Sequence, residues 1–215
     1  MKAVIFDFNG TLFIDHDKHI EAWGKMSQLL RGQPLTPYEL EHYINGVPNK
    51  KIIAYLVGKR LDEKEVEKYS KQKEAIYRQC CLEDPAHLKL IDGCIAYFAY
   101  LKKNNIPMTI CSASIKENID FFFDTFSLSQ WFDYNKVIYD NGQYISKVEM
   151  FKDAASVLEV DIGECLVFED SISGIKSAHE AGVSNIYVIG DESKQEPYLC
   201  ESIVKYIKNF NDVLE

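Results

Sequence analysis

Acidic, amide and hydroxyl side chains follow a short apolar run near the amino terminus. The run Ala3-Val-Ile-Phe6 is typical of a buried strand, and it leads directly into Asp7, Asn9, Gly10 and Thr11. Ligands bind at the carboxyl ends of strands in open α/β sheets, so we expect Asp7 at a ligand-binding edge. A carboxylate there can act as a nucleophile, although capping a helix is an equally common role.

Three further polar segments follow predicted strands later in the chain. They are Ser112 with Ala113, then Lys147, and then the pair Glu169 and Asp170. Each has a more ordinary interpretation alone: a turn serine, a solvated lysine, and a cap for the helix that follows. Their common placement after strands favours a shared functional site.

The four segments resemble the four motifs of the haloacid dehalogenase (HAD) superfamily of phosphatases and mutases, in the same order. The first motif of that family, Asp-x-Asp-Gly-Thr, reads Asp7-Phe8-Asn9-Gly10-Thr11 here, so its second acid is replaced by Asn9. The resemblance covers the whole predicted core. It implies an α/β fold, a Rossmann-like parallel sheet with an inserted helical cap.

The resemblance also implies a Mg²⁺ cofactor and an attacking carboxylate. Asp7 would form an aspartyl phosphate, and a divalent cation would offset the repulsion between this carboxylate and the phosphate. The implied oxygen ligands are Asp7, the backbone carbonyl of Asn9 and Asp170, with Glu169 as a further ligand or a neighbour of the ligands.

Phosphate binding is implied for a second group of residues. Lys147 would neutralise phosphate charge, although Val148 stands where the family usually has a proline after the lysine. The hydroxyl of Ser112 and the backbone N–H groups of Asn9 and Ala113 would donate hydrogen bonds to phosphate oxygens.

Asn9 leaves the catalytic assignment open, because an amide cannot transfer a proton. General acid–base catalysis is worth ~10²–10⁴-fold. One explanation is a phosphatase for substrates with good leaving groups, with His19 or another cap residue substituting for the acid. The alternatives are a weak or inactive protein that binds a phosphorylated metabolite, and an engineered substitution at Asn9.

Apolar periodicity predicts two kinds of organisation along the chain. Residues 15 to 87 read as helix only, whereas strands and helices alternate from 88 onward, which is typical of a parallel sheet. The predicted domains are therefore a core of 1–14 and 88–215 and a cap of 15–87. After the first strand, the expected strands are 108–111, 137–139, 165–168, 185–189 and a short one after Ser202.

The helical segment is similar to the small cap of the β-phosphoglucomutase-like and phosphoglycolate-phosphatase-like branch. His19 and Trp23 match the mutase branch, and His19 is a candidate substrate-binding residue, although a helical histidine is more often structural. A phosphotransferase is therefore an alternative, although Asn49 stands where that mutase has an arginine. A phosphonoacetaldehyde-hydrolase-like reaction using Lys50 or Lys51 is less favoured.

Composition narrows the classes of partner. The chain has 215 residues, 47% of them hydrophobic, and a net charge of −9, which disfavours binding to nucleic acid or an anionic membrane. The six cysteines form no Cys-x-x-Cys pair, and neither a signal peptide nor a membrane span is expected. We predict a cytoplasmic Mg²⁺-dependent phosphatase for a small phosphorylated metabolite, with sugar phosphates among the candidates.

Overall fold

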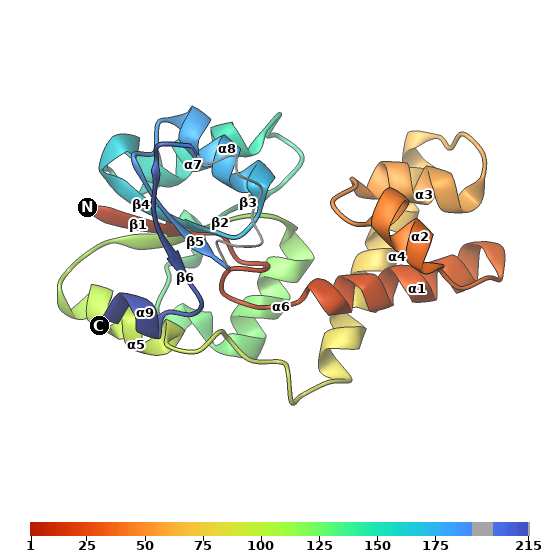
Figure 1. Ribbon diagram of the computed structural model, residues 1–215, viewed down its shortest axis with the longest axis horizontal. Helices are drawn as coiled ribbons and strands as arrows, with labels where there is room; N and C mark the ends of the chain where they lie inside the picture. Colours follow the sequence, from red (N-terminus) through yellow and green to blue (C-terminus); the bar gives the residue numbers. More distant parts are fainter. Residues whose placement is uncertain (191–199, 215) are drawn as a thin grey trace. The chain divides into compact units, whose positions relative to one another are not determined.

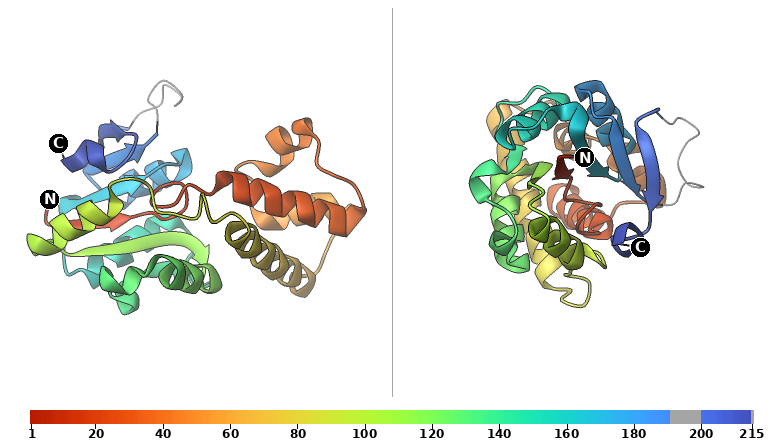
Figure 2. Two further views of the ribbon diagram at one scale, coloured as in Figure 1. Left: turned by 90° about the horizontal axis from the view of Figure 1, so that it is seen from below. Right: turned by 90° about the vertical axis from the view of Figure 1, so that its left-hand side faces the viewer.

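The chain folds into two compact units (Figures 1 and 2). The computed structural model describes residues 1–190 and 200–214. The first unit, which we call the α/β unit, comprises Met1–Ile14 and Lys89–Glu215, and the second, the helical unit, comprises Asp15–Leu88. The chain therefore leaves the α/β unit after its first strand and returns to it after the four helical segments of the insert.

A six-stranded parallel sheet forms the centre of the α/β unit, in the order β3-β2-β1-β4-β5-β6. β1 lies between β2 and β4, where Phe6 pairs with Ile110 on one side and with Phe168 on the other. The predicted α/β fold with a parallel sheet is thus confirmed. The strands are β1 (Ala3–Phe6), β2 (Met108–Ile115), β3 (Ile138–Asp140), β4 (Cys165–Glu169), β5 (Asn185–Ile189) and β6 (Ile203–Ile207).

Helices cover both faces of this sheet (Figure 1), which explains why β1 and β4 are buried along their whole length. One face packs a mainly aliphatic cluster that includes Ile5, Val167 and Val188. The other face packs aromatic rings such as Phe6 and Phe168, which stack with 5.2 Å between their centroids. The helices of the unit are α5 (Cys94–Lys103), α6 (Lys116–Phe126), α7 (Lys147–Val157), α8 (Ile172–Ala181) and α9 (Asn211–Leu214), with single 3₁₀ turns η2 (Leu128–Gln130), η3 (Tyr134–Lys136) and η4 (Ile162–Glu164).

β2 is longer than the sequence predicted. The apolar run 108–111 was expected to be the strand, with Ser112 in the loop beyond it, but β2 continues to Ile115. The extension arises because Ser112 pairs with Tyr139 and Ile115 pairs with Asp140 of the edge strand β3, with a register shift between the two pairs. Such a bulge redirects side chains at the end of a strand.

The helical unit contains α1 (His16–Arg31), α2 (Pro37–Glu39) with the π-helical segment η1 (Leu40–Ile44), α3 (Asn49–Val57) and α4 (Glu63–Leu82). Every residue of this unit is described, and none lies in a strand. The side chains of Trp23, Met26, Ile53 and Leu56 form its apolar centre. Capping boxes begin α2 at Thr36 and α4 at Asp62, as their sequences predict.

No helix in the described parts of the chain is both long enough and apolar enough to cross a membrane.

Candidate active site

Asp7 begins the tight turn that follows β1. Its backbone N–H still donates to the carbonyl of Phe168 at 3.0 Å, which extends the sheet pairing by one residue. The turn then closes through three N–H groups that donate to the carbonyl of Phe8, whose ring stacks on Phe122 at 4.1 Å. Gly10 adopts φ +80°, and a Cβ there would lie 2.2 Å from Oδ2 of Asp170. The glycine therefore permits the close approach of the turn to Asp170.

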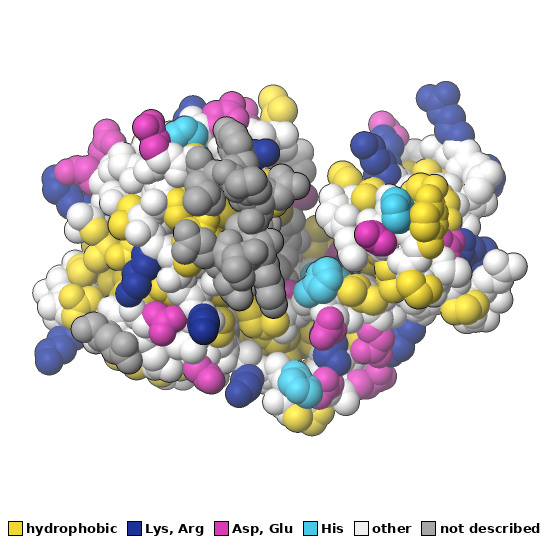
Figure 3. Space-filling view, viewed as in Figure 1, with side chains coloured by type: hydrophobic (Ala, Val, Ile, Leu, Met, Phe, Trp, Pro, Cys, Tyr) yellow, Lys and Arg dark blue, Asp and Glu magenta, His cyan; other side chains and the backbone are white. Residues whose placement is uncertain are grey.

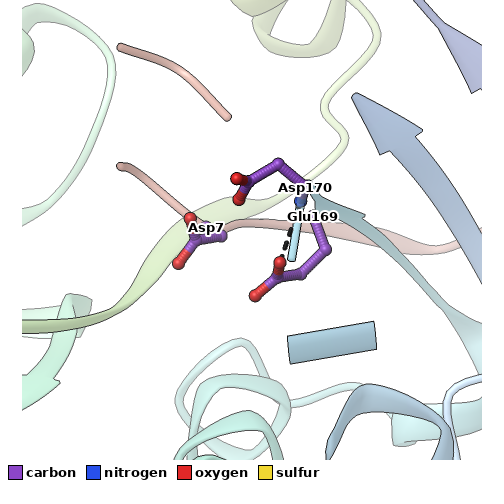
Figure 4. A group of neighbouring side chains, drawn as sticks. All are labelled: Asp7, Glu169 and Asp170. Atoms are coloured by element: carbon purple, nitrogen blue, oxygen red, sulfur yellow. Dashed lines mark hydrogen bonds between the residues drawn. The ribbon is translucent and has the colours of Figure 1, made fainter. Parts of the chain in front are cut away.

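Three carboxyl groups converge at the carboxyl ends of β1 and β4 (Figure 4). One oxygen from each of Asp7, Glu169 and Asp170 lies within 4.8 Å of the others. Asp7 is 4% exposed and Glu169 is fully buried, and Asp170 accepts a hydrogen bond of 3.2 Å from the hydroxyl of Thr11. Carboxylate oxygens are ligands that a hard divalent cation prefers, so this group could hold one.

Lys147, the first residue of α7, links two of these acids. Its ammonium group donates to Asp7 at 2.6 Å and also contacts Glu169 directly. The other oxygen of Glu169 accepts the N–H groups of Asp170 and Ser171 at 2.8 and 2.9 Å. Glu169 thus orients Lys147 and the turn after β4, and its carboxylate lies beside those of Asp7 and Asp170 (Figure 4).

Burial and neighbouring charges raise the pKa values of Asp7 and Asp170. Burial raises the pKa of Asp7 to about 8, with Lys147 opposing and Glu169 and Asp170 adding to the increase. Burial and then the Glu169 charge raise the pKa of Asp170 to about 7. Burial lowers the pKa of Lys147, but the Asp7 and Glu169 carboxylates outweigh it and the net shift is upward. The cluster contains more negative charge than its lysine balances, so a bound cation would stabilise it.

Hydroxyl groups from the end of β2 reach the residue that replaces the second acid. The hydroxyl of Ser114 donates to Oδ1 of Asn9 at 2.7 Å, and that of Ser112 lies 3.4 Å from the same oxygen. Ser112 is 1% exposed, whereas Ala113, between the two serines, is exposed. Sequence reasoning found Ser112 but missed Ser114, although a spacing of two along a strand places both on one side.

The sequence motifs and the geometry of the site indicate the same family, and a match to a family model establishes the assignment. The model for haloacid dehalogenase-like hydrolases matches residues 1–182. The chain belongs to this family. In this HAD-like hydrolase the segments that match the four motifs lie in the α/β unit, with Asn9 in place of the second acid. The structure brings six of their residues to one edge of the sheet: Asp7, Asn9, Ser112, Lys147, Glu169 and Asp170.

Solved structures agree with this assignment of the HAD-like hydrolase. A family IA, variant 3 HAD hydrolase from Entamoeba histolytica has a TM-score of 0.90 and 36% identity, covering 99% of this chain and 95% of that one. A β-phosphoglucomutase from Clostridium difficile has the same fold, with a TM-score of 0.77 and 21% identity over 99% of this chain and 93% of that one. This second likeness shows the shared fold.

Curated relatives of the HAD-like hydrolase are named as phosphatases. A phosphorylated carbohydrates phosphatase from Thermotoga maritima is 25% identical over 87% of this chain and 84% of its own length. The chloroplastic 5-amino-6-(5-phospho-D-ribitylamino)uracil phosphatase of Arabidopsis thaliana is 24% identical over 94% of this chain. The chain spans about half, 54%, of that plant protein. These relatives support phosphoric monoester hydrolysis as the reaction class of this hydrolase.

The helical unit of the HAD-like hydrolase contains a buried polar network around His19. Lys73, only 1% exposed, donates to Nδ1 of His19 at 2.7 Å and to Glu74 at 2.9 Å. Nε2 of His19 lies 3.4 Å from Asp15, which also accepts the hydroxyl of Tyr77. Both ring nitrogens of His19 therefore face partners within its own unit, and an ammonium donor at Nδ1 favours the tautomer protonated at Nε2.

Asn49 takes part in the same network. Its side-chain amide donates to Glu74 at 3.0 Å, the carboxylate that also pairs with Lys73. Burial lowers the pKa of Lys73, and the Glu74 charge opposes that shift. The network explains how a lysine is accommodated in the interior of the helical unit, since buried charges need partners.

Proposed function

We propose that this protein is a Mg²⁺-dependent phosphatase that hydrolyses a small phosphorylated metabolite, with sugar phosphates as the first candidates. The observation that carries the proposal is the carboxylate cluster of Asp7, Glu169 and Asp170 with Lys147 bonded to two of its members. All of its metal-facing donors are oxygens, and its acids outnumber its lysine. That donor set fits Mg²⁺, which would neutralise phosphate charge and polarise the phosphoryl group.

Asp7 is the proposed nucleophile because it is the buried carboxylate on the turn after the central strand. One of its oxygens would attack phosphorus, and the bond from phosphorus to the ester oxygen would break to leave an aspartyl phosphate. Water would then hydrolyse this intermediate and release inorganic phosphate. Together with Asp7, the proposed metal ligands are Asp170 and the backbone carbonyl of Asn9. Glu169 is either a further ligand or a neighbour that orients the ligands.

Phosphate oxygens would be bound by donors at the same edge of the sheet. Lys147 supplies a fixed positive charge, held in place by Asp7 and Glu169. Ser112 supplies a hydroxyl, and the backbone N–H groups of Asn9 and Ala113 are the further proposed donors. Donors fixed before the substrate arrives stabilise developing charge with little reorganisation.

The helical unit is the proposed cap, and His19 is its proposed substrate-binding residue. A cap excludes water and bulky substrates, which favours a small metabolite over a phosphorylated protein. Asn49, bonded to Glu74, offers no positive charge for a second phosphate. This difference favours hydrolysis of a monophosphate over the phosphotransferase alternative.

A second candidate function follows from Asn9 itself. The amide at this position cannot protonate the leaving oxygen, so the chain would be a phosphometabolite-binding protein with weak or no turnover. Both candidates use the same donors for phosphate, and they differ only in whether the phosphorus–oxygen bond is broken.

Turnover separates the two candidates. We would measure phosphate release from p-nitrophenyl phosphate and from a panel of phosphorylated sugars, with Mg²⁺ and with EDTA. The proposal expects release that needs Mg²⁺ and is lost in Asp7→Asn but retained in Asp124→Asn, where the replaced acid is exposed on α6. Equal release by wild type and Asp7→Asn would overturn the phosphatase, and phosphate binding by calorimetry would then favour the binding protein.

A further inference from the structure

A second cavity lies in the α/β unit at the amino-terminal ends of the strands. Its volume is about 460 Å³. Leu166, the second residue of β4, and Asn185, the first of β5, line it together with Val204 of β6. Glu169 lies three residues further along β4, and three residues of strand span about 10 Å. The cavity therefore opens at the opposite edge of the sheet from the carboxylate cluster.

Tyr97 gives the cavity a hydroxyl group that makes no hydrogen bond with the described residues. The residue is 2% exposed, and its ring packs against Phe6, Phe168 and Phe210 at centroid distances of 6.2, 5.5 and 5.7 Å. Its hydroxyl makes no hydrogen bond with any described residue, and Tyr97 lines the cavity. Burial raises the pKa of Tyr97, with Tyr187 and Tyr100 adding to the shift, so the hydroxyl stays protonated and able to donate.

The other side chains that line the cavity are aromatic, aliphatic or uncharged polar groups. The ring of Tyr100 lies nearly parallel to that of Tyr97, with 6.1 Å between the two centroids. Tyr187 of β5 also lines the cavity. The hydroxyls of Tyr100 and Tyr187 and the amide of Asn185 also make no hydrogen bond with described residues. Among those residues, no acidic or basic side chain lines the cavity.

We propose that this cavity is a binding site for an uncharged, planar molecule that carries hydrogen-bonding groups, such as a phenol or a neutral heterocyclic base. Tyrosine rings favour flat aromatic ligands, and the unpaired hydroxyls and amide would bind polar groups at the ligand's edge. The volume falls within the roughly 300–1,000 Å³ range of small-molecule sites. A phosphorylated ligand is disfavoured because, within residues 1–190 and 200–214, no lysine or arginine lines the site.

The rim of the cavity is unusually apolar for a solvent-exposed surface. Met1, Tyr100, Val204 and Leu214 are 56%, 47%, 55% and 40% exposed and surround the opening. Hydrophobic side chains also gather on this side of the α/β unit in the space-filling view (Figure 3). An apolar rim around a neutral cavity would exclude water from a bound ring. The rival occupant is an aromatic side chain of a second copy, which the same experiment tests.

p-Cresol is the first probe, because it is a neutral ring with one hydroxyl. Titration followed by amide NMR should shift the resonances of Asn185, Tyr187 and Val204 with saturation, and 4-hydroxybenzoate, which is anionic, should bind at least tenfold more weakly. Tyr97→Phe keeps the buried ring and removes the hydroxyl, so it should weaken p-cresol binding about 3- to 10-fold. Tyr139→Phe, on the far edge strand β3, should leave the affinity unchanged.

Three results would overturn the proposal. They are the absence of saturable p-cresol binding, equal affinity in the Tyr97→Phe and Tyr139→Phe variants, and binding of 4-hydroxybenzoate as tight as that of p-cresol. Light scattering tests the second copy as occupant. Concentration-dependent dimers that Val204→Glu abolishes would assign the rim to self-association instead. Phosphate release serves as the check that each variant is folded, since the carboxylate cluster lies at the other edge of the sheet.

Discussion

The hydroxyl of Ser114 donates a hydrogen bond of 2.7 Å to Oδ1 of Asn9. This bond fixes the side-chain amide so that its oxygen faces the end of β2. A carboxylate at the same position would accept the same bond, because Asp and Asn share the Oδ1 acceptor. The second carboxylate oxygen would occupy the place of the amide nitrogen. The position is therefore already shaped for an acid.

Asn9→Asp should increase turnover of an alkyl phosphate on the order of 10²-fold, the lower end of the acid–base range. The new carboxyl group can protonate a poor leaving oxygen, which the amide cannot. An aryl phosphate should gain less, since its leaving group needs little protonation. Steady-state rates on both ester types, for wild type and variant, measure this difference.

His19→Ala provides the matching test of a replacement acid. Its ring nitrogens face Lys73 and Asp15, so we expect no more than a small loss of the catalytic rate on alkyl phosphates. A large loss in His19→Ala, together with no gain in Asn9→Asp, would mean that His19 already performs the proton transfer. Unchanged activity in both variants would contradict the proposed role of Asn9.

Asp170→Asn should weaken Mg²⁺ binding by at least tenfold, because a neutral amide replaces an anionic ligand beside Asp7. Isothermal calorimetry with Mg²⁺ measures the affinity without any need for turnover. The control is Asp124→Asn, which removes the same charge from the exposed face of α6. Equal losses in both variants would indicate a general charge effect and contradict the assignment of Asp170 as a ligand.

Mg²⁺ affinity should fall as the pH decreases from 8 to 6. The pKa values of Asp7 and Asp170 are raised to about 8 and about 7, so protons occupy these carboxyl groups in the metal-free protein and must leave when Mg²⁺ binds. Calorimetry in buffers of different ionisation enthalpy should detect proton release on binding. Affinity that is constant over this range would contradict the raised pKa values.

The same shifts fix the sign of the stability effect. Carboxyl groups with raised pKa values hold more protons in the folded than in the unfolded state, so the metal-free protein should lose stability as the pH rises from about 4 to 8. The melting-temperature increase produced by Mg²⁺ should accordingly be larger at pH 8 than at pH 6. A larger increase at pH 6 would contradict this linkage.

Gly174→Ala should destabilise the α/β unit despite the better helix propensity of alanine. A Cβ at Gly174 would lie 1.7 Å from Oε1 of Glu169, so Glu169 would have to leave its hydrogen bonds. We expect a cost of about 1–3 kcal/mol, typical of overpacking. Gly24→Ala is the control, because a Cβ at Gly24 of α1 meets no atom within 4 Å. It should stabilise by ~0.5–1 kcal/mol.

Thermal denaturation of both glycine variants gives the comparison directly. A domain of this size changes its melting temperature by roughly 2–4 °C per kcal/mol. A melting temperature for Gly174→Ala that equals or exceeds that of wild type would mean that Glu169 relaxes freely, and that its hydrogen bonds do not hold the turn after β4.

The sheet, and the edge of it that carries the polar side chains, were predictable because each strand is marked by a short continuous stretch of sequence. A fully buried strand leaves an uninterrupted apolar run, as in 3–6 and 165–168, and side chains after parallel strands meet at one edge. The contacts across the site were not predictable in the same way. Ser114 reaches Asn9 only because β2 continues to Ile115, and that extension depends on pairing with β3.

The buried network of the helical unit had no signal in the sequence. A lysine in a long amphipathic helix is normally solvated, so Lys73 offered no reason to expect 1% exposure. Its burial depends on His19 and Glu74, of which one lies 54 residues away and the other is its immediate neighbour. Only the packing of α1 against α4 brings the histidine to it.

β1 has its pairing partners far along the chain, which constrains the order of folding. The strand begins at Ala3, but β2 begins at Met108 and β4 at Cys165. During synthesis its apolar residues must wait until more than a hundred further residues have been made, while the contacts of the helical unit are all available earlier. Contacts at short sequence separation form faster than distant ones. The intervening helices are thus placed to fold on the ribosome before β1 can pair with β2 and β4.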